Sequence, residues 1–219
     1  MEIFVPFEIM VGGMKHRRFH QLILNFLEAH DTIISKTTNR NFLGVTIMRV
    51  ETIETERLYL RGFQKEDAIF AISIWNDPEM GEYLPDPAME EIDKEYLKEI
   101  EMLSEDEACC YMIAEFKDTH KRVGTCSFIP SKDGKSYDIA YCVHKKYGRN
   151  GYATEMARGM VDYAKKHGAG KVTVRVNREN TASNAVVKKI GFEVIGEKRY
   201  KKRGTELEFC DYLYELQVE

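Results

Sequence analysis

Long apolar runs are missing from the 219-residue sequence. None approaches the roughly 18 residues that a membrane-spanning helix needs. The order of a signal peptide is also missing, because the basic residues 15–18 come after the first apolar stretch rather than before it. We therefore expect a soluble protein with no membrane partner and a cytoplasmic location.

Metal-binding and disulfide patterns are absent as well. The 5 cysteines are an odd number, and none lies in a Cys-x-x-Cys spacing. This pattern predicts reduced thiols and argues against a disulfide framework or a zinc site. No His-Glu-x-x-His motif occurs either, so we expect no metal.

Several motifs that would define an enzyme class cannot be found. The chain has no Gly-Lys-Ser/Thr of a P-loop and no Gly-x-Ser-x-Gly of a serine hydrolase. Gly148 and Gly151 do not fit the Gly-x-Gly-x-x-Gly spacing of a dinucleotide site. The net charge of -4 argues against bulk electrostatic binding of nucleic acid, so we expect no direct nucleic-acid partner.

The composition is that of a globular protein, with 43% hydrophobic and 31% charged residues. Residues 1–50 differ from the rest, because a short apolar helix over residues 19–27 lies between loop-like flanks. This helix could dock on the main domain or on a partner, but we favour an appendage with little function of its own. The predicted organisation is an N-terminal extension over residues 1–50 and one domain over residues 51–219.

From residue 53 onward the sequence alternates strand and helix patterns. Residues 58–61 predict a short strand, and helices are expected over residues 65–75 and 88–103. Short turns then join three extended runs, which predicts an antiparallel meander. These runs cover residues 109–116, 123–129 and 137–143.

The second half of the chain predicts a parallel crossover and a closing hairpin. An alternating run at residues 171–177 follows a helix, which makes it a parallel neighbour of the last meander strand. A shorter helix begins after Asn180 and ends at Gly191. Residues 192–200 and 207–216 form the closing hairpin, and the basic cluster at its tip, residues 198–203, is expected to be solvated. An RNA or ribosome contact is the less favoured interpretation of that cluster.

The chain is organised around residues 147–155, where a Gly-containing loop runs directly into an amphipathic helix. Apolar residues recur with helical spacing at Ala153, Met156, Ala157, Met160, Val161 and Ala164. A helix N-terminus that follows small residues offers unpaired backbone N–H groups and the positive end of the helix dipole. The stretch therefore predicts a site for a phosphate-bearing cofactor.

These segments together resemble the acetyl-CoA site of the GNAT N-acetyltransferase superfamily. The resemblance rests on residues 147–155, 177–183 and 189–192, with support from residues 54–61 and 75–78. Within the superfamily, the chain is most similar to the subgroup that contains the ribosomal-protein N-terminal acetyltransferases. The resemblance covers residues 51–216 and leaves the first 50 residues unexplained.

The resemblance implies a GNAT fold of the α/β (α+β) class. Its sheet would be mixed, mostly antiparallel and twisted, with about seven strands flanked by helices and the two central strands splayed at the acetyl-CoA site. Loop amides would hold the CoA pyrophosphate, namely those of Arg149, Asn150, Gly151, Tyr152, Ala153 and Thr154. The pantetheine would pair like an extra strand with Tyr141, Cys142 and Val143. One of these amides would polarise the thioester carbonyl. Where the family's loop pattern starts with Gln or Arg this chain has Gly148, and the neighbouring Arg149 is the candidate for that charge.

Transfer to an amine requires a neutral nucleophile, and therefore a base. Asp138 lies where related enzymes of the subgroup often carry an acidic residue, and it is equally interpreted as an exposed strand-edge carboxylate or a partner for a nearby Lys. Ser183 resembles the serine proposed to protonate the CoA thiolate in that subgroup, and it is equally a first-turn residue that bonds backbone. The tyrosine of the wider superfamily is replaced by Val187. Asn180 is both a helix cap and a CoA contact, and Cys142 is interpreted as a buried thiol.

Our first hypothesis is an enzyme that moves an acetyl group from acetyl-CoA to a primary amine by direct attack. The acceptor would be a protein N-terminus, such as that of a ribosomal protein, or a small-molecule amine. The second hypothesis is a CoA-binding sensor or interaction module that has the fold but no turnover. The acceptor and the oligomeric state, monomer or homodimer, stay open.

Overall fold

The structure is a computed structural model that describes residues 50–106, 110–131 and 133–218. The helix expected over residues 19–27 lies outside the described residues, as does nearly all of the expected extension over residues 1–50. The boundary between that extension and the domain stays a prediction. Among the described residues, no helix combines the length and the apolar character that crossing a bilayer requires.

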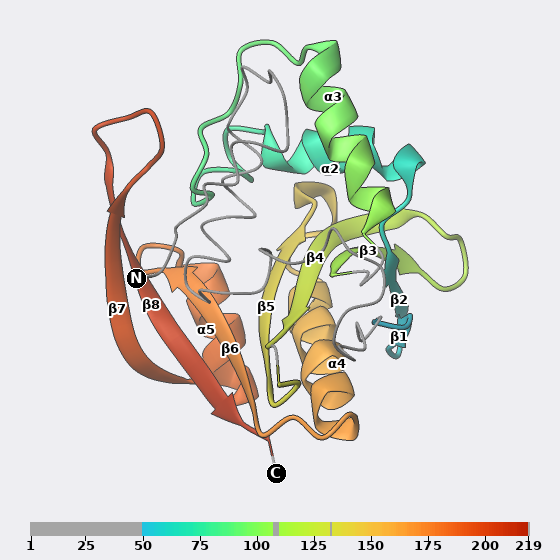
Figure 1. Cartoon of the computed structure of the whole chain (residues 1–219), viewed down its shortest axis with the longest axis vertical. Helices are drawn as coiled ribbons and strands as arrows, with labels where there is room; N and C mark the ends of the chain where they lie inside the picture. The colour runs from blue at the N-terminus through green and yellow to red at the C-terminus, as the bar shows by residue number, and fades with distance from the viewer. Residues whose placement is uncertain (1–49, 107–109, 132, 219) are drawn as a thin grey trace, which may run out of the picture. The chain divides into compact units, whose positions relative to one another are not determined.

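One mixed sheet of 8 strands forms the centre of the described domain, in the order β1-β2-β3-β4-β5-β6-β8-β7 (Figure 1). The strands are β1 Ile53–Glu54, β2 Leu58–Gly62, β3 Tyr111–Phe116, β4 Arg122–Pro130, β5 Ser136–Val143, β6 Lys171–Asn177, β7 Glu193–Lys201 and β8 Glu208–Gln217. The prediction of about seven strands was one short, because the two-residue β1 pairs antiparallel with β2. So short a strand carries no alternating pattern that a sequence could reveal.

The predicted meander and crossover are confirmed. Strands β3, β4 and β5 pair antiparallel in succession, and β5 pairs parallel with β6. That parallel pairing runs only from Ser136↔Lys171 to Ile139↔Val174, although both strands continue beyond it. The two central strands therefore separate after Ile139 and Val174, as the predicted fold requires.

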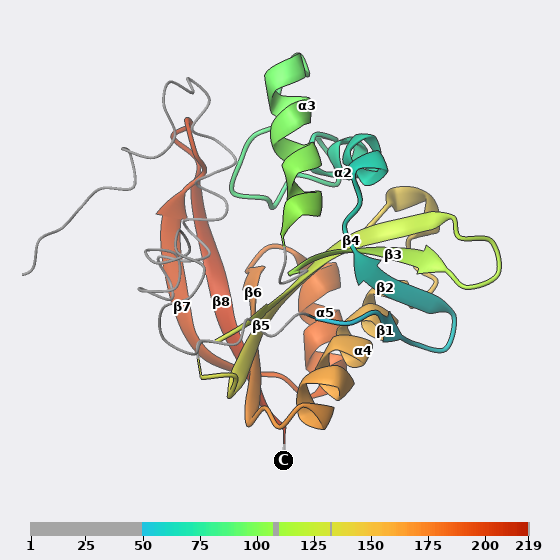
Figure 2. The ribbon, with the colours of Figure 1, turned by 45° about the vertical axis from the view of Figure 1, so that its right-hand side comes forward.

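Helices α4 (Tyr152–Lys166) and α5 (Thr181–Ile190) lie beside each other on one face of the sheet, as Figures 1 and 2 show. The predicted apolar stripe of α4 is buried there, and Met156 and Met160 are completely enclosed. Burying a methionine side chain of this size stabilises a fold by about 2 kcal/mol. Because α4 is fixed in this way, its N-terminal end keeps one position beside the end of β5.

A second helical layer packs near β4 on the opposite face. It consists of the 3-10 turn η3 (Lys65–Asp67), helix α2 (Ala68–Trp75), helix α3 (Lys94–Glu101) and the 3-10 turn η4 (Met102–Glu105). The helix predicted over residues 88–103 begins only at Lys94, because Asp93 caps it with a hydrogen bond from the amide of Tyr96. Further upstream, the Asn76 side chain donates to the carbonyl of Met89 and accepts from its amide. These two bonds hold the backbone at Met89 outside a helix.

The tip of the β7–β8 hairpin also differs from expectation. Lys198, Arg199 and Lys201 are exposed as predicted, but Lys202 is only 8% exposed and donates to the carbonyl of Glu82 at 2.7 Å. The guanidinium of Arg203 lies 2.5 Å from the carboxylate of Asp86. The interpretation of the whole cluster as solvated was therefore wrong for Lys202 and Arg203, which join the hairpin to the segment between α2 and α3.

Candidate active site

The predicted phosphate loop joins the 3-10 turn η5 (Lys145–Tyr147) to α4, and its backbone bends sharply twice. Arg149 has a φ of 62° and Gly151 a φ of 81°, which is the left-handed region. Glycine accepts this conformation without steric cost, so Gly151 is well suited to precede α4. The side chain of Asn150 donates to the carbonyls of Tyr147 and Gly148 and holds the loop closed.

The first turn of α4 presents the amides of Tyr152, Ala153 and Thr154, which have no acceptor within a helix. Glu155 belongs to the same turn, but its carboxylate faces Arg57, whose Nε and main-chain N–H donate to it at 2.7 and 2.6 Å. Burial alone would raise the pKa of Glu155, yet the hydrogen bonds from Thr55 and Arg57 lower it. Arg57 thereby balances the one negative charge beside the exposed amides.

The opening between the central strands contains the residues predicted to pair with an extended ligand. Tyr141, Cys142 and Val143 lie beyond the last β5–β6 pair, while on their other edge they pair with β4. Gly124 of β4 permits this close pairing, because a Cβ there would lie 2.3 Å from the carbonyl oxygen of Cys142. The edge of β5 that faces β6 is left open to an extended partner.

A pair of hydroxyl groups lies at this opening. The hydroxyls of Tyr141 and Ser183 are 3.0 Å apart, although one residue belongs to β5 and the other to the first turn of α5. Burial raises the pKa of Tyr141 to about 12 and the hydrogen bond with Ser183 opposes the shift, so the phenol is neutral at physiological pH. The amide of Ser183 donates to the side chain of Asn180, which confirms the predicted helix cap. The contact between the hydroxyls and the Asn180 cap together fix the positions of Tyr141 and Ser183.

Asp138 lies on the other face of the same strand. Its neighbours Tyr137 and Ile139 belong to the core that packs against α4, so strand alternation turns Asp138 away from α4. Asp138 is 9% exposed and accepts a hydrogen bond of 2.8 Å from the hydroxyl of Thr173. It belongs to a central strand and not to an edge of the sheet, so its interpretation as an exposed strand-edge carboxylate was wrong.

Comparisons with known proteins bear on this arrangement. A family model described as an acetyltransferase (GNAT) domain matches residues 57–193, more than half of the chain. The chain belongs to the GNAT acetyltransferase family. It is therefore an acetyl-CoA-dependent N-acetyltransferase.

Relatives and solved structures agree with the family. The uncharacterised N-acetyltransferase p20 of Bacillus licheniformis is 29% identical over 153 residues, which cover 67% of this chain and 85% of the relative. A GNAT-family acetyltransferase from Bacillus anthracis has the same fold, with a TM-score of 0.66, 23% identity and coverage of 76% of this chain and 98% of that chain. A spermidine N-acetyltransferase from Vibrio cholerae, solved with CoA and spermine, gives a TM-score of 0.61 and 15% identity over 74% of this chain and 95% of that chain.

Two further observations concern the chemistry that a GNAT enzyme needs. Cys142 is only partly buried, where a buried strand thiol was predicted, but desolvation raises the pKa of its thiol to about 12 and keeps it protonated. Within residues 50–106, 110–131 and 133–218, no group of three or more His, Cys, Asp or Glu side chains is arranged to hold a metal ion. Acetyl transfer from a thioester to an amine requires a base and a proton donor, which side chains can supply.

Two features of the GNAT site were not predicted from the sequence. The prediction gave Tyr141 a backbone contact only, because the distance from its hydroxyl to Ser183 depends on how far the strands separate. Asn184 was also missed. Its amide donates to the carbonyls of Asn177 and Asn180 while it accepts from the hydroxyl of Tyr214, so it fixes the turn before Ser183. An asparagine inside a predicted helix was the available signal, since asparagine side chains compete for backbone groups.

Proposed function

We propose that this GNAT enzyme acetylates a primary amine by direct attack on acetyl-CoA, with both co-substrates bound together. The observation that carries the proposal is the opening between β5 and β6, which has Asp138 on one face of the sheet and the Tyr141–Ser183 pair on the other. A direct transfer must remove a proton from the amine and supply one to the departing sulfur. Two proton-handling groups on opposite faces of one opening suit these two needs.

The donor half of the proposal assigns the pyrophosphate to the loop and to the start of α4. The amides of Arg149, Asn150, Gly151, Tyr152, Ala153 and Thr154 would bind it. The left-handed backbone at Gly151 and the balanced charge of Glu155 support this assignment. Tyr141, Cys142 and Val143 would bind the pantetheine as an added strand, and Asn180 would contact CoA beside them.

Acetyl-CoA supplies the acetyl group as a reactive thioester. One amide among Tyr141, Cys142 and Val143 donates to the thioester carbonyl and stabilises the charge that develops on its oxygen. Asp138 accepts the proton that the amine loses when it forms the C–N bond. Its position one residue before the strands separate places it on the face from which the amine would approach.

The Tyr141–Ser183 pair acts at the other bond. As the C–S bond breaks, the paired hydroxyls donate to the sulfur and pass it a proton, which solvent then replaces. Where the wider superfamily carries its proton-donating tyrosine, this chain has Val187, which has no hydroxyl and is fully buried in the core. The Tyr141–Ser183 pair would supply the missing hydroxyl. Ser183 thus keeps its predicted role, and Tyr141 gains one through its side chain.

The acceptor is a primary amine, either of a protein N-terminus or of a small molecule. The resemblance to ribosomal-protein acetyltransferases supports the first class, and a protein of the same fold solved with spermine supports the second. A screen of both classes decides between them. Purified enzyme is given acetyl-CoA with peptides that carry free N-termini, polyamines or amino sugars, and thiol release is measured. Turnover with an amine is expected, whereas acetyl-CoA binding without turnover on any amine would favour the sensor hypothesis.

Three substitutions test the proposed roles. Asp138→Asn, Ser183→Ala and Tyr141→Phe should each lower kcat by about 100-fold, because positioned acid–base groups typically contribute at least that much. Asp162→Asn changes one exposed carboxylate of α4 and should leave kcat unchanged. Acetyl-CoA binding, measured by calorimetry, should persist in all four variants. If Asp138→Asn and Asp162→Asn have equal kcat values, the assignment of the base is wrong.

A further inference from the structure

A hollow lies beside the phosphate loop, with a volume of about 400 Å³. This size falls within the range of about 300–1,000 Å³ that is usual for small-molecule sites. One wall is aromatic and consists of Phe70, His144 and Tyr147. The rings of Phe70 and His144 stack with centroids 6.0 Å apart and planes 17° from parallel. The other lining residues are basic, namely His120, Lys121, Arg122 and Lys146.

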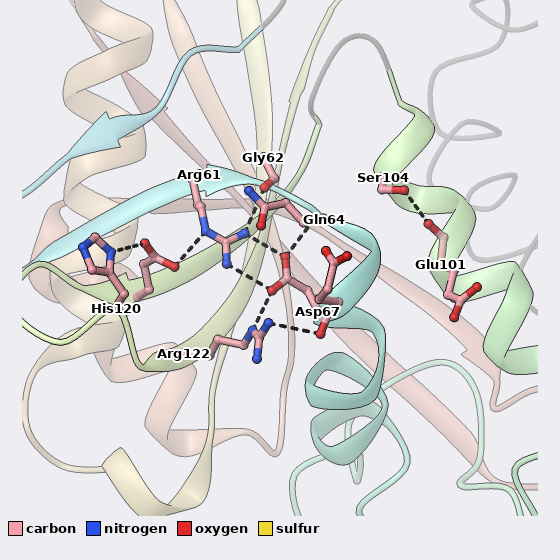
Figure 3. A network of polar contacts seen from close by, with 10 residues as sticks. Arg61, Gly62, Gln64, Asp67, Glu101, Ser104, His120 and Arg122 are labelled. Atoms are coloured by element: carbon pink, nitrogen blue, oxygen red, sulfur yellow. Dashed lines mark hydrogen bonds and ion pairs between the residues drawn. The ribbon is translucent and has the colours of Figure 1, made fainter.

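Two of the basic groups are held in place from behind. Buried Asp67 accepts from the Nε of Arg122 at 2.6 Å and also pairs with Arg61, as Figure 3 shows. The carboxylate of Glu115 binds Nδ1 of His120 at 2.8 Å. These contacts leave the His120 ring 68% exposed. Arg122 and His120 are therefore oriented before any ligand arrives, which lowers the entropy cost of binding.

The other two basic groups supply uncompensated charge. Within the described ranges, neither Lys121 nor Lys146 has an acidic partner, whereas the adjacent Lys145 pairs with Asp77 at 2.7 Å. The ammonium of Lys146 lies 5.8 Å from the centre of the Tyr147 ring. The hollow is thus locally positive on a chain with a net charge of -4, and it favours an anion.

This hollow is separate from the opening that holds the proposed transfer site. The opening lies between β5 and β6, whereas the hollow is lined by the β3–β4 turn and by Phe70 of α2. Those elements lie on the β4 side of β5, where the amide of His144 donates to the carbonyl of Val123. Lys146 and Tyr147 belong both to the hollow and to the 3-10 turn η5 that leads into the phosphate loop.

We propose that the hollow binds a nucleotide, with its phosphate at Lys121, Arg122 and Lys146 and its base against the aromatic wall. Guanidinium and ammonium groups are the usual protein partners of phosphate, and rings of Phe, Tyr and His stack on nucleobases. The chemistry fits a free nucleotide, and it also fits the phosphorylated adenosine end of a CoA molecule whose pyrophosphate lies on the neighbouring loop. Binding of the adenosine end of CoA rests on the proposed function, whereas binding of a free nucleotide does not.

The test uses AMP as the probe and calorimetry as the readout, on the full chain. AMP should bind the unmodified protein, and the double variant Lys121→Ala/Lys146→Ala should bind it about tenfold more weakly, since two exposed charged contacts are lost. The matched control Lys165→Ala/Lys166→Ala removes the same charge from the exposed end of α4 and should bind AMP normally. The proposal is overturned if AMP does not bind at millimolar concentration, or if the two double variants bind it equally.

Competition of CoA and dephospho-CoA with AMP distinguishes a free nucleotide from the adenosine end of CoA. If AMP still binds in the presence of saturating CoA, the ligand is a separate nucleotide. If CoA displaces AMP and dephospho-CoA does not, the hollow holds the terminal phosphate of CoA, and the Lys121→Ala/Lys146→Ala variant should lose its preference for CoA over dephospho-CoA. Acetyl transfer from acetyl-dephospho-CoA should be the same in the unmodified protein, in Lys121→Ala/Lys146→Ala and in Lys165→Ala/Lys166→Ala. Failure of this inference is therefore distinguishable from failure of the proposed function.

Discussion

The crossover unit (residues 136–190) and the helical cap (residues 63–105) are held together by different kinds of contact. In the crossover unit, the phosphate loop and the start of α5 are held by bonds that are short in sequence, as when the Asn150 side chain closes its own loop or Asn180 caps its own helix. In the helical cap they span long distances, as when Lys202 reaches Glu82, 120 residues away, and Trp75 reaches Thr125, 50 residues away.

This difference has a functional consequence. A unit whose geometry depends on local backbone conformation keeps its shape when distant residues change, which suits the binding of one invariant co-substrate. A cap that is held by side chains from other segments can be reshaped by single substitutions, which suits the recognition of varied acceptors. Damage to the crossover unit should therefore affect acetyl-CoA, and damage to the cap contacts should affect the amine.

The largest effect is expected from Gly124→Ala, a change in β4 that forces the neighbouring strand β5 of the crossover unit to move. The new Cβ would lie 2.3 Å from the carbonyl oxygen of Cys142. Overpacking of this kind costs about 1–3 kcal/mol and would shift the strand that is proposed to bind pantetheine. We expect kcat/KM for acetyl-CoA to fall by about 100-fold in steady-state kinetics. Gly170→Ala is the matched control, because its nearest contact would be an ordinary 3.8 Å.

A smaller effect, on the other co-substrate, is expected from Lys202→Met. The substitution keeps the length of the side chain but leaves the carbonyl of Glu82 without its 2.7 Å donor. This bond is part-buried, and the loss of such a hydrogen bond costs about 1 kcal/mol, so the hairpin tip should loosen from the cap. The KM for the amine should rise by about tenfold while the KM for acetyl-CoA stays the same. Lys201→Met alters an exposed neighbour and should change neither; equal KM values in both variants would contradict the comparison.

Acid should weaken the crossover unit through Glu155. Its pKa is lower in the folded chain than the value of 4.5 for an unperturbed carboxyl, despite the opposing effect of burial. The unfolded chain therefore takes up this proton first, and the stabilisation that is present above that value is lost as the pH falls through the folded pKa. Urea midpoints between pH 6 and pH 3 should fall less in Glu155→Gln than in the unmodified protein. Parallel curves would show that the Arg57–Glu155 contact contributes no acid sensitivity.

The same comparison explains which features could be predicted from the sequence. The apolar spacing of α4 and the Asn180 cap are local signals, and the structure confirms them. The start of α3 was predicted too early, because the two bonds between Asn76 and Met89 depend on how the chain folds back. Burial of Lys202 and the 3.0 Å contact between Tyr141 and Ser183 likewise depend on three-dimensional positions that no spacing rule reveals.

The smallest effect is expected from Arg57→Lys, which tests whether the crossover unit needs any distant support at all. Arg57 contacts the crossover unit from outside it, since its Nε binds Glu155 at 2.7 Å and its Nη1 donates to the carbonyl of Asn150 at 3.1 Å. Lysine keeps the charge but cannot make both bonds, because only the planar guanidinium forms a fork. The side chain is 43% exposed, so solvent replaces much of what is lost. The KM for acetyl-CoA should rise by only about two- to threefold, which corresponds to about 0.5 kcal/mol. A tenfold rise in the KM for acetyl-CoA would mean that the phosphate loop depends on its contacts with Arg57 as strongly as the cap depends on Lys202.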